Sequence, residues 1–152
     1  LIEAGEMGGD CLNAGCVPSK ALIASAKHAH AMTDGADFGV APVTPLVDFA
    51  AVKDRVARVI ATIAPIDSQE RFEGLGVRVI RARGRFTGPD TVEAGGHAIR
   101  ARRFVVATGS HPFVPPIPGI DTLPYLTNEN VFALRERPTH LIVIGGGPIG
   151  ME

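Results

Sequence analysis

Two cysteines standing directly ahead of a helical pattern constrain this chain more than any other feature. Cys11 and Cys16 are five positions apart, and Pro18 fits the first turn of the helix that follows, where a missing N–H costs nothing. A bond between them would close a very small ring, which by the chain-entropy model adds only about 2 kcal/mol of stability. Cys16 would lie at the helix N-terminus, whose dipole favours a thiolate. The pair therefore suits reversible redox chemistry, although two buried core cysteines are an equally good interpretation from the spacing alone.

A metal site built on these cysteines would need further ligands. Two cysteines are too few for a disulfide scaffold or for a four-ligand zinc site. His28 and His30 are two positions apart in a predicted helix, which places them on nearly opposite faces. The sequence therefore predicts no metal site.

Two helical segments follow the cysteines. Residues 19–33 are rich in alanine, with apolar side chains at helical spacing, and the spacing predicts a helix. Residues 36–46 contain two prolines and are predicted as a loop. Residues 47–73 again carry apolar side chains at helical spacing, and Pro65 should kink or split this second helix.

The remaining pattern is that of strands. Residues 1–3 look like the end of a strand that closes on an acid, and a second strand is expected to begin at residues 77–80. Residues 91–102 predict a hairpin. The continuously apolar runs at residues 104–107 and 141–144 are typical of strands buried in a parallel sheet.

Composition excludes several classes of protein. Lys plus Arg number 15 and Asp plus Glu number 16, and this balance argues against a nucleic-acid-binding domain. An arginine run, which a solvated meander face explains better than an anion site, comprises Arg78, Arg81, Arg83, Arg85, Arg100, Arg102 and Arg103. No apolar run approaches the roughly 18 residues of a membrane span. We expect a cytoplasmic protein with neither nucleic-acid nor membrane partners.

The cysteine segment resembles a known active-site motif. Residues 8–20 read G-G-D-C-L-N-A-G-C-V-P-S-K and resemble the pattern GG-T-C-x-N-x-G-C-x-P-S-K of the FAD-dependent pyridine nucleotide–disulfide oxidoreductases, the family of dihydrolipoamide dehydrogenase, glutathione reductase and mercuric reductase. Every fixed position matches except Asp10, where the family usually has a Thr beside the flavin diphosphate. The resemblance implies that Cys11 and Cys16 form a redox-active disulfide.

Other segments extend the resemblance in the same order. Glu3 matches the acid that holds the adenosine ribose of FAD, and Gly84 matches a glycine at the adenine end. Lys20 and Glu152 match an ion pair beside the flavin ring, although alone they would be an exposed helix lysine and a terminal glutamate. The cofactor-binding residues that the resemblance implies are Glu3, Gly8, Gly9, Lys20, Gly84, Thr108, Gly109, Ser110, Gly145, Gly147, Gly150 and Glu152.

The implied fold is α/β, an FAD/NAD(P)-binding Rossmann-like fold with a β-meander, truncated at both ends. Residues 1–112 would be part of the FAD-binding domain, residues 113–138 a proline-rich connector, and residues 139–152 the start of the NAD(P)-binding domain. The chain begins in a strand tail and stops after a glycine turn, so we expect an interior piece of a longer protein. The first FAD glycine motif and the family's His–Glu acid–base pair would lie outside it.

The implied activity is that of an NAD(P)H-dependent oxidoreductase. Electrons would pass from NAD(P)H through FAD to the disulfide by way of Cys16, and Cys11 would exchange with a small disulfide or metal-ion substrate. Several segments look closest to mercuric-reductase-like members, and the full-length protein would be a homodimer. A non-catalytic dithiol module that binds soft metal ions is one alternative. A piece of 152 residues that is inert by itself is another, because both dinucleotide sites are incomplete.

Overall fold

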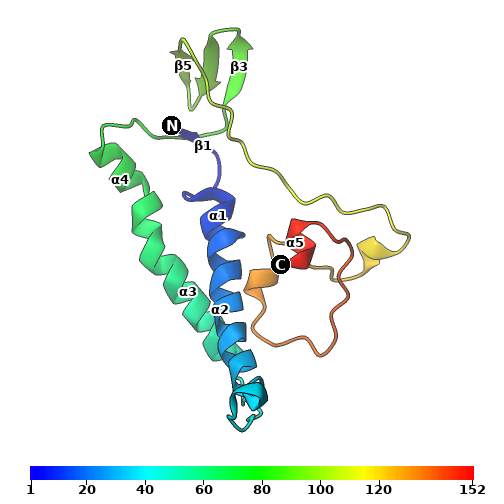
Figure 1. Ribbon diagram of the computed structural model, residues 1–152. Helices are drawn as coiled ribbons and strands as arrows, with labels where there is room; N and C mark the ends of the chain where they lie inside the picture. The colour runs from blue at the N-terminus through cyan, green and yellow to red at the C-terminus, as the bar shows by residue number, and fades with distance from the viewer.

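The computed structural model describes residues 1–152 as a helical hairpin, a small β-meander and a long connector that returns to the helices (Figure 1). The helices are α1 (Gly9–Asn13), α2 (Cys16–Thr33), α3 (Phe49–Ile63), α4 (Gln69–Gly74) and α5 (Pro148–Met151). The strands are β1 (Ile2–Glu3), β2 (Ile80–Arg81), β3 (Arg85–Gly88), β4 (Thr91–Ala94) and β5 (His97–Arg100). Four short 3-10 turns complete the regular structure.

The helical hairpin confirms both helix predictions. α2 and α3 lie side by side (Figure 1), and the Arg55 side chain of α3 donates a hydrogen bond of 2.8 Å to the carbonyl oxygen of Ala21 in α2. Asp48 caps α3 by accepting from the backbone N–H of Ala51 at 3.0 Å. Pro65 falls in a 3-10 turn, Ala64–Asp67, which separates α3 from α4 as the sequence predicted.

Buried side chains form two small clusters. One lies among α1, α2 and α3 and contains Leu12, Pro18, Ala21, Lys53 and Val56. The other lies in β4 of the meander and contains Val92 and Ala94. The helical cluster is the one that fixes the cysteine segment, because Leu12 of α1 belongs to it.

Two separate sheets are present. β1 pairs with β2 in parallel, with Ile2 opposite Ile80 and Glu3 opposite Arg81. β3, β4 and β5 form an antiparallel meander, in which the register shifts between Phe86 and Gly88. The predicted hairpin is confirmed, whereas the strand expected from residue 77 begins only at Ile80.

The two predicted buried strands at residues 104–107 and 141–144 are wrong for this structure. Neither segment forms a strand, and their side chains are exposed, with Val105 at 93% and Ile142 at 76%, except for Phe104, which is half-buried against Phe86. An extended apolar run becomes a buried strand only when neighbouring strands satisfy its N–H and C=O groups. The two sheets contain only β1–β2 and β3–β4–β5, so neither run has a strand to pair with.

The connector leaves the meander and brings α5 back beside α2 (Figure 1). Three contacts fasten it on the way. His111 bonds to Glu129 at 2.7 Å, Arg135 pairs with Asp54 of α3 at 2.6 Å, and the Asn128 side chain lies 3.5 Å from a carbonyl oxygen between α1 and α2. None of the five helices is long and apolar enough to pass through a lipid bilayer.

We expect Leu12→Ala to lower the free energy of unfolding by about 2–5 kcal/mol, because it opens a cavity where α1 meets the helical hairpin. Leu46 is the matched control, since its side chain is fully exposed and its truncation should cost no more than about 0.5 kcal/mol. Urea unfolding followed by circular dichroism measures both. Equal losses for the two variants would contradict the role of Leu12.

Candidate active site

The two cysteines lie on either side of the break between α1 and α2. Cys11 belongs to α1 and Cys16 is the first residue of α2, with Gly15 as its N-cap. A Cβ on Gly15 would stand 2.9 Å from the carbonyl oxygen of Asp10 and 3.6 Å from the Cα of Cys11, so only glycine allows this close approach. Both side chains are exposed free thiols, and Cys16 lies close enough to raise the pKa of Cys11. Their bonding as a disulfide stays a prediction.

The Cys11 thiol holds its proton more tightly than an ordinary cysteine does. The hydrogen bond with Cys16 raises the pKa of Cys11, and partial burial and the negative charges of Cys16 and Asp67 act in the same direction. Cys11 therefore keeps its proton to a higher pH than an ordinary cysteine. Its use as a nucleophile requires a group that removes this proton.

The predicted ion pair between Lys20 and Glu152 is present. The Lys20 Nζ lies 2.5 Å from the Glu152 Oε1, although the two residues are 132 positions apart. The pairing raises the pKa of Lys20, and the negative charges of Cys16 and Cys11 add to the effect, so the ammonium lies near the dithiol. The hydrogen bonds from Lys20 and then from Ser19 lower the pKa of Glu152. The pair is therefore ionised at neutral pH.

The glycine turn at residues 145–150 delivers Glu152 to this position. A Cβ on Gly150 would clash with the carbonyl oxygen of Gly145, so the turn closes tightly only with glycine there. Gly147 caps α5, and Pro148 occupies its first position, where proline is favoured. Gly145 and Gly147 have open space beside them. Both lie in the turn that leads into α5.

Glu3 and Gly84, which the sequence assigned to one end of the cofactor, lie together. The Glu3 carboxylate ends β1, and one of its oxygens accepts from the Gly5 N–H at 2.7 Å. The other oxygen accepts no hydrogen bond from the chain, so it is available to a ligand hydroxyl. Gly84 packs beside β1, where an added Cβ would lie 3.5 Å from Ile2.

The glycines at the start of α1 have different roles. Gly8 has φ +87°, and a Cβ there would clash with Leu12, so its conformation is required by packing. Gly9 has φ +55° and nothing within 4 Å of the place a Cβ would take. Only Gly9 therefore leaves an open surface that a ligand could approach.

Asp10, the one departure from the family pattern, contacts the turn at residues 108–110. Its Oδ2 lies 3.3 Å from the place that a Cβ on Gly109 would take, and Gly109 has φ +69°. The hydrogen bond to Glu129, followed by the charges of Glu129 and Asp10, raises the pKa of His111. Asp10 thus has a histidine nearby that can carry the opposite charge.

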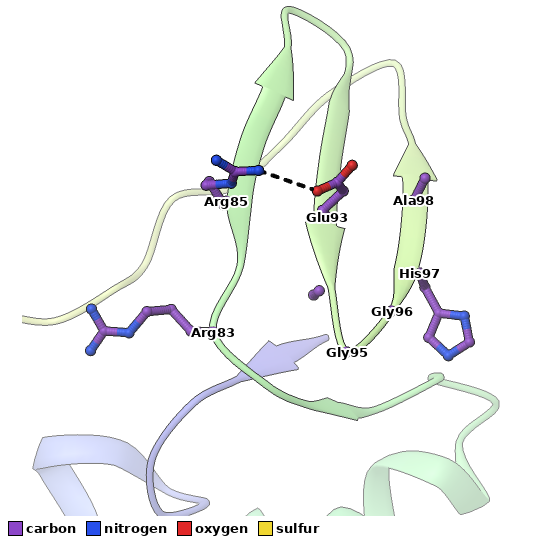
Figure 2. Close-up of a pocket in the computed structure, with 8 residues that line it drawn as sticks. Arg83, Arg85, Glu93, Gly95, Gly96, His97 and Ala98 are labelled. Carbon is purple, nitrogen blue, oxygen red and sulfur yellow. Dashed lines mark ion pairs between the residues drawn. The ribbon is translucent and has the colours of Figure 1, made fainter.

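A shallow hollow lies away from these residues. This hollow of about 340 Å³ lies on the meander and is lined by Arg83, Arg85, Glu93, Ala94, Gly95, Gly96, His97 and Ala98 (Figure 2). Figure 2 shows Arg83 and His97 pointing away from each other, while Arg85 pairs with Glu93 at 3.5 Å. No set of side chains converges there, which fits a solvated meander face.

The residues predicted to bind FAD fit that group at three places. Glu3 offers an open carboxylate oxygen for ribose hydroxyls, Gly9 leaves backbone surface open, and Lys20 offers a cation beside the dithiol. Asp10 fits less well, because a carboxylate there repels a diphosphate unless a cation such as protonated His111 offsets it. The arrangement places the two thiols near the positive charge of Lys20.

Comparison with known proteins decides the family. The family model described as pyridine nucleotide-disulphide oxidoreductase matches residues 1–152, the whole chain. The chain belongs to this family. Mercuric reductase of Bacillus cereus is 34% identical over 152 residues, which cover all of this chain and 24% of that protein. Glutathione reductase of Burkholderia cepacia is 31% identical over 157 residues, which cover all of this chain and 33% of that protein.

A solved relative has the same fold. The structure of the HOCl-induced flavoprotein disulfide reductase RclA from Escherichia coli matches with a TM-score of 0.77 and 28% identity, over 99% of this chain and 32% of that one. The chain thus spans about a quarter to a third of the length of these relatives. The resemblance and the α/β FAD/NAD(P)-binding fold predicted from the sequence are confirmed, and pyridine nucleotide-disulphide oxidoreductases use FAD and NAD(P)H.

The sequence missed two contacts of the site. Ser19 lies within the matched motif, but only its neighbour Lys20 was assigned a role. No local pattern shows that Glu152 lies within hydrogen-bond distance of both residues. Asp67 follows the split in the second helix, and its charge acts on Cys11. Only the folded structure, which brings the turn at residues 64–67 within electrostatic range of Cys11, could have revealed it.

Removing Cys16 should lower the pKa of Cys11. In Cys16→Ala the hydrogen bond and the neighbouring negative charge are both lost, so Cys11 should become reactive at lower pH than in the reduced wild type. Iodoacetamide alkylation of Cys11 as a function of pH, followed by mass spectrometry, measures this. Asp67→Asn is the graded control, with a smaller shift in the same direction. An unchanged profile in Cys16→Ala would show that the thiols do not interact.

His111 should titrate above the ordinary histidine range, and its ion pair with Glu129 should be lost as the pH rises through that raised pKa. Glu129→Gln should lower the pKa of His111 most, because the hydrogen bond to Glu129 is the main cause. Asp10→Asn should lower it less. Histidine NMR titration measures all three, with His140 as an internal reference. No change in Asp10→Asn would mean that Asp10 does not act on His111.

Proposed function

We propose that this chain is part of a flavoprotein oxidoreductase that passes electrons from NAD(P)H to a redox-active Cys11–Cys16 pair and on to a disulfide or metal-ion substrate. The observation that carries the proposal is the ion pair of Lys20 with Glu152, which places a cation beside the dithiol from segments at opposite ends of the chain. FAD, when bound, would supply the two-electron acceptor between nicotinamide and sulfur. Lys20 would stabilise the negative charge that develops next to it.

The two thiols would divide the work on a disulfide substrate. The Cys11 thiolate would attack one substrate sulfur, forming a mixed disulfide and releasing the first substrate thiolate. The Cys16 thiolate would then attack the Cys11 sulfur, closing the Cys11–Cys16 bond and releasing the second thiolate. Two electrons pass from the dithiol to the substrate, and the two released thiolates take up two protons. Cys11 is exposed to an incoming substrate, and because its pKa is raised, a base has to remove its proton before it attacks.

The substrate class follows from the chemistry of two adjacent thiols. Thiolate sulfur exchanges with disulfides and coordinates soft metal ions such as Hg(II). Proteins named mercuric reductase and one named glutathione reductase are among the relatives of this chain, and they stand for these two substrate classes. Choice between the two classes depends on groups beyond Cys11 and Cys16.

The organisation predicted from the sequence belongs to the same proposal. Residues 1–112 would contribute to an FAD-binding domain, residues 113–138 would connect, and residues 139–152 would begin an NAD(P)-binding domain. The exposed apolar runs at residues 104–107 and 141–144 would then pair with strands of the full-length protein. A cytoplasmic homodimer remains our prediction for that protein.

A non-catalytic dithiol module is the competing function. Two exposed free thiols next to one another could hold a soft metal ion without any flavin. The two proposals differ over Lys20, because a metal-binding dithiol has no need of a paired cation beside it. Flavin absorbance in the full-length protein separates them.

In the full-length protein we expect Lys20→Met to slow reduction of the flavin by NAD(P)H by roughly tenfold or more, because a charge that stabilises the reduced state is removed. Stopped-flow absorbance measures the rate. Lys27→Met is the matched control, since Lys27 is an exposed lysine of the same helix with no ion pair. The Cys11–Cys16 disulfide should stay intact in both variants.

Three outcomes would contradict the proposal in different ways. A full-length protein without flavin would favour the dithiol module. Equal rates in Lys20→Met and the wild type would remove Lys20 from the mechanism. Substrate reduction that survives in Cys11→Ser would show that the electrons bypass the cysteines.

A further inference from the structure

One oxygen of Glu152 receives two donors from neighbouring residues of α2. The Ser19 Oγ donates to Oε1 at 2.7 Å, and the Lys20 Nζ donates to the same Oε1 at 2.5 Å. The Ser19 hydroxyl also lies 3.3 Å from the carbonyl oxygen of Cys16, one turn back in the helix. A hydroxyl has one proton, and the shorter contact, to a charged acceptor, takes it. The bond to Glu152 therefore dominates.

We propose that Ser19 is a positioning residue, whose hydroxyl holds the Glu152 carboxylate so that Lys20 is fixed beside the dithiol. The effect of Ser19 on flavin reduction rests on the proposed function, whereas the hydrogen bond between Ser19 and Glu152 does not. Lys20 has a long flexible side chain that is 67% exposed, and an exposed ion pair by itself fixes geometry poorly. Ser19 has a short side chain on the first turns of the helix, so its hydroxyl has little freedom.

The competing interpretation is that Ser19 only stabilises the start of α2. A serine hydroxyl commonly bonds to a carbonyl three or four residues back, and this contact is present at 3.3 Å. Such a bond would need neither Lys20 nor Glu152. The two interpretations therefore predict different results when Glu152 is removed.

The effect of Ser19 on the pKa of Glu152 supports the proposal that Ser19 acts through this carboxylate. Hydrogen bonds from Lys20 and Ser19 both lower the pKa of Glu152. Loss of the Ser19 hydroxyl should raise that pKa, while Lys20 remains the main partner. With Lys20 as its only remaining donor, the Glu152 carboxylate would be held less firmly.

The test uses the full-length flavoprotein with Ser19→Ala, alone and in a Glu152→Ala background, and with Ser19→Thr as the variant that keeps a hydroxyl. Ser19→Ala should slow flavin reduction by NAD(P)H by roughly 2- to 10-fold, the range of one hydrogen bond. It should have no further effect in Glu152→Ala, and Ser19→Thr should restore the rate. Carbon-13 NMR of the glutamate carboxyl should show a raised pKa of Glu152 in Ser19→Ala and not in Ser19→Thr.

Ser25→Ala is the matched control, because Ser25 lies in the same helix and bonds only to the carbonyl oxygen of Ala21, at 3.4 Å. It should leave the rate and the pKa of Glu152 unchanged. Equal slowing by Ser19→Ala with and without Glu152 would overturn the proposal in favour of the helix-stabilising role. An unchanged pKa of Glu152 in Ser19→Ala would also overturn it. If the wild type binds no flavin, the proposed function fails, and the pKa of Glu152 still decides the role of Ser19.

Discussion

The packing of α2 against α3 supports the part of the candidate active site that contains the two cysteines and Lys20. α2 carries Cys16 and Lys20 at its beginning, and α3 presents Val56 to the same buried cluster that holds Leu12 of α1. The Arg55 side chain links the two helices by its bond to a backbone carbonyl of α2. Without this support α1 would have no surface to pack on, and the two sulfur atoms would lose their relative placement.

α3 also determines where the far end of the chain arrives. The Lys53 Nζ lies 5.5 Å from the centre of the Phe132 ring, and Asp54 pairs with Arg135. These two adjacent residues of α3 therefore anchor the returning connector. Burial, followed by repulsion from Arg135, lowers the pKa of Lys53, and the aromatic ring offsets part of the cost of its placement. Both contacts precede the glycine turn in the chain, so they limit the distance between Glu152 and α2.

Local patterns predicted what local forces decide. The helices at residues 19–33 and 47–73 and the split at Pro65 follow from spacing and backbone chemistry, and the structure has all three. The runs at residues 104–107 and 141–144 show the limit, because a strand depends on partners that the run itself does not encode. The ion pair of Lys20 with Glu152 came from the family resemblance, since no rule of spacing joins residues so far apart. The Ser19 contact needed the three-dimensional structure.

The break between α1 and α2 has a consequence for the redox couple itself. The two sulfur atoms belong to different helices, which meet at Gly15. Even a methyl group on Gly15 would come too close to the carbonyl oxygen of Asp10. Any larger residue there would wedge the helices apart and lengthen the gap that a sulfur–sulfur bond has to span. A disulfide needs Cα atoms within about 7 Å, so the proposed bond between Cys11 and Cys16 would depend on this spacing. A residue with no functional group of its own thus controls how closely the segments that carry the two cysteines approach each other.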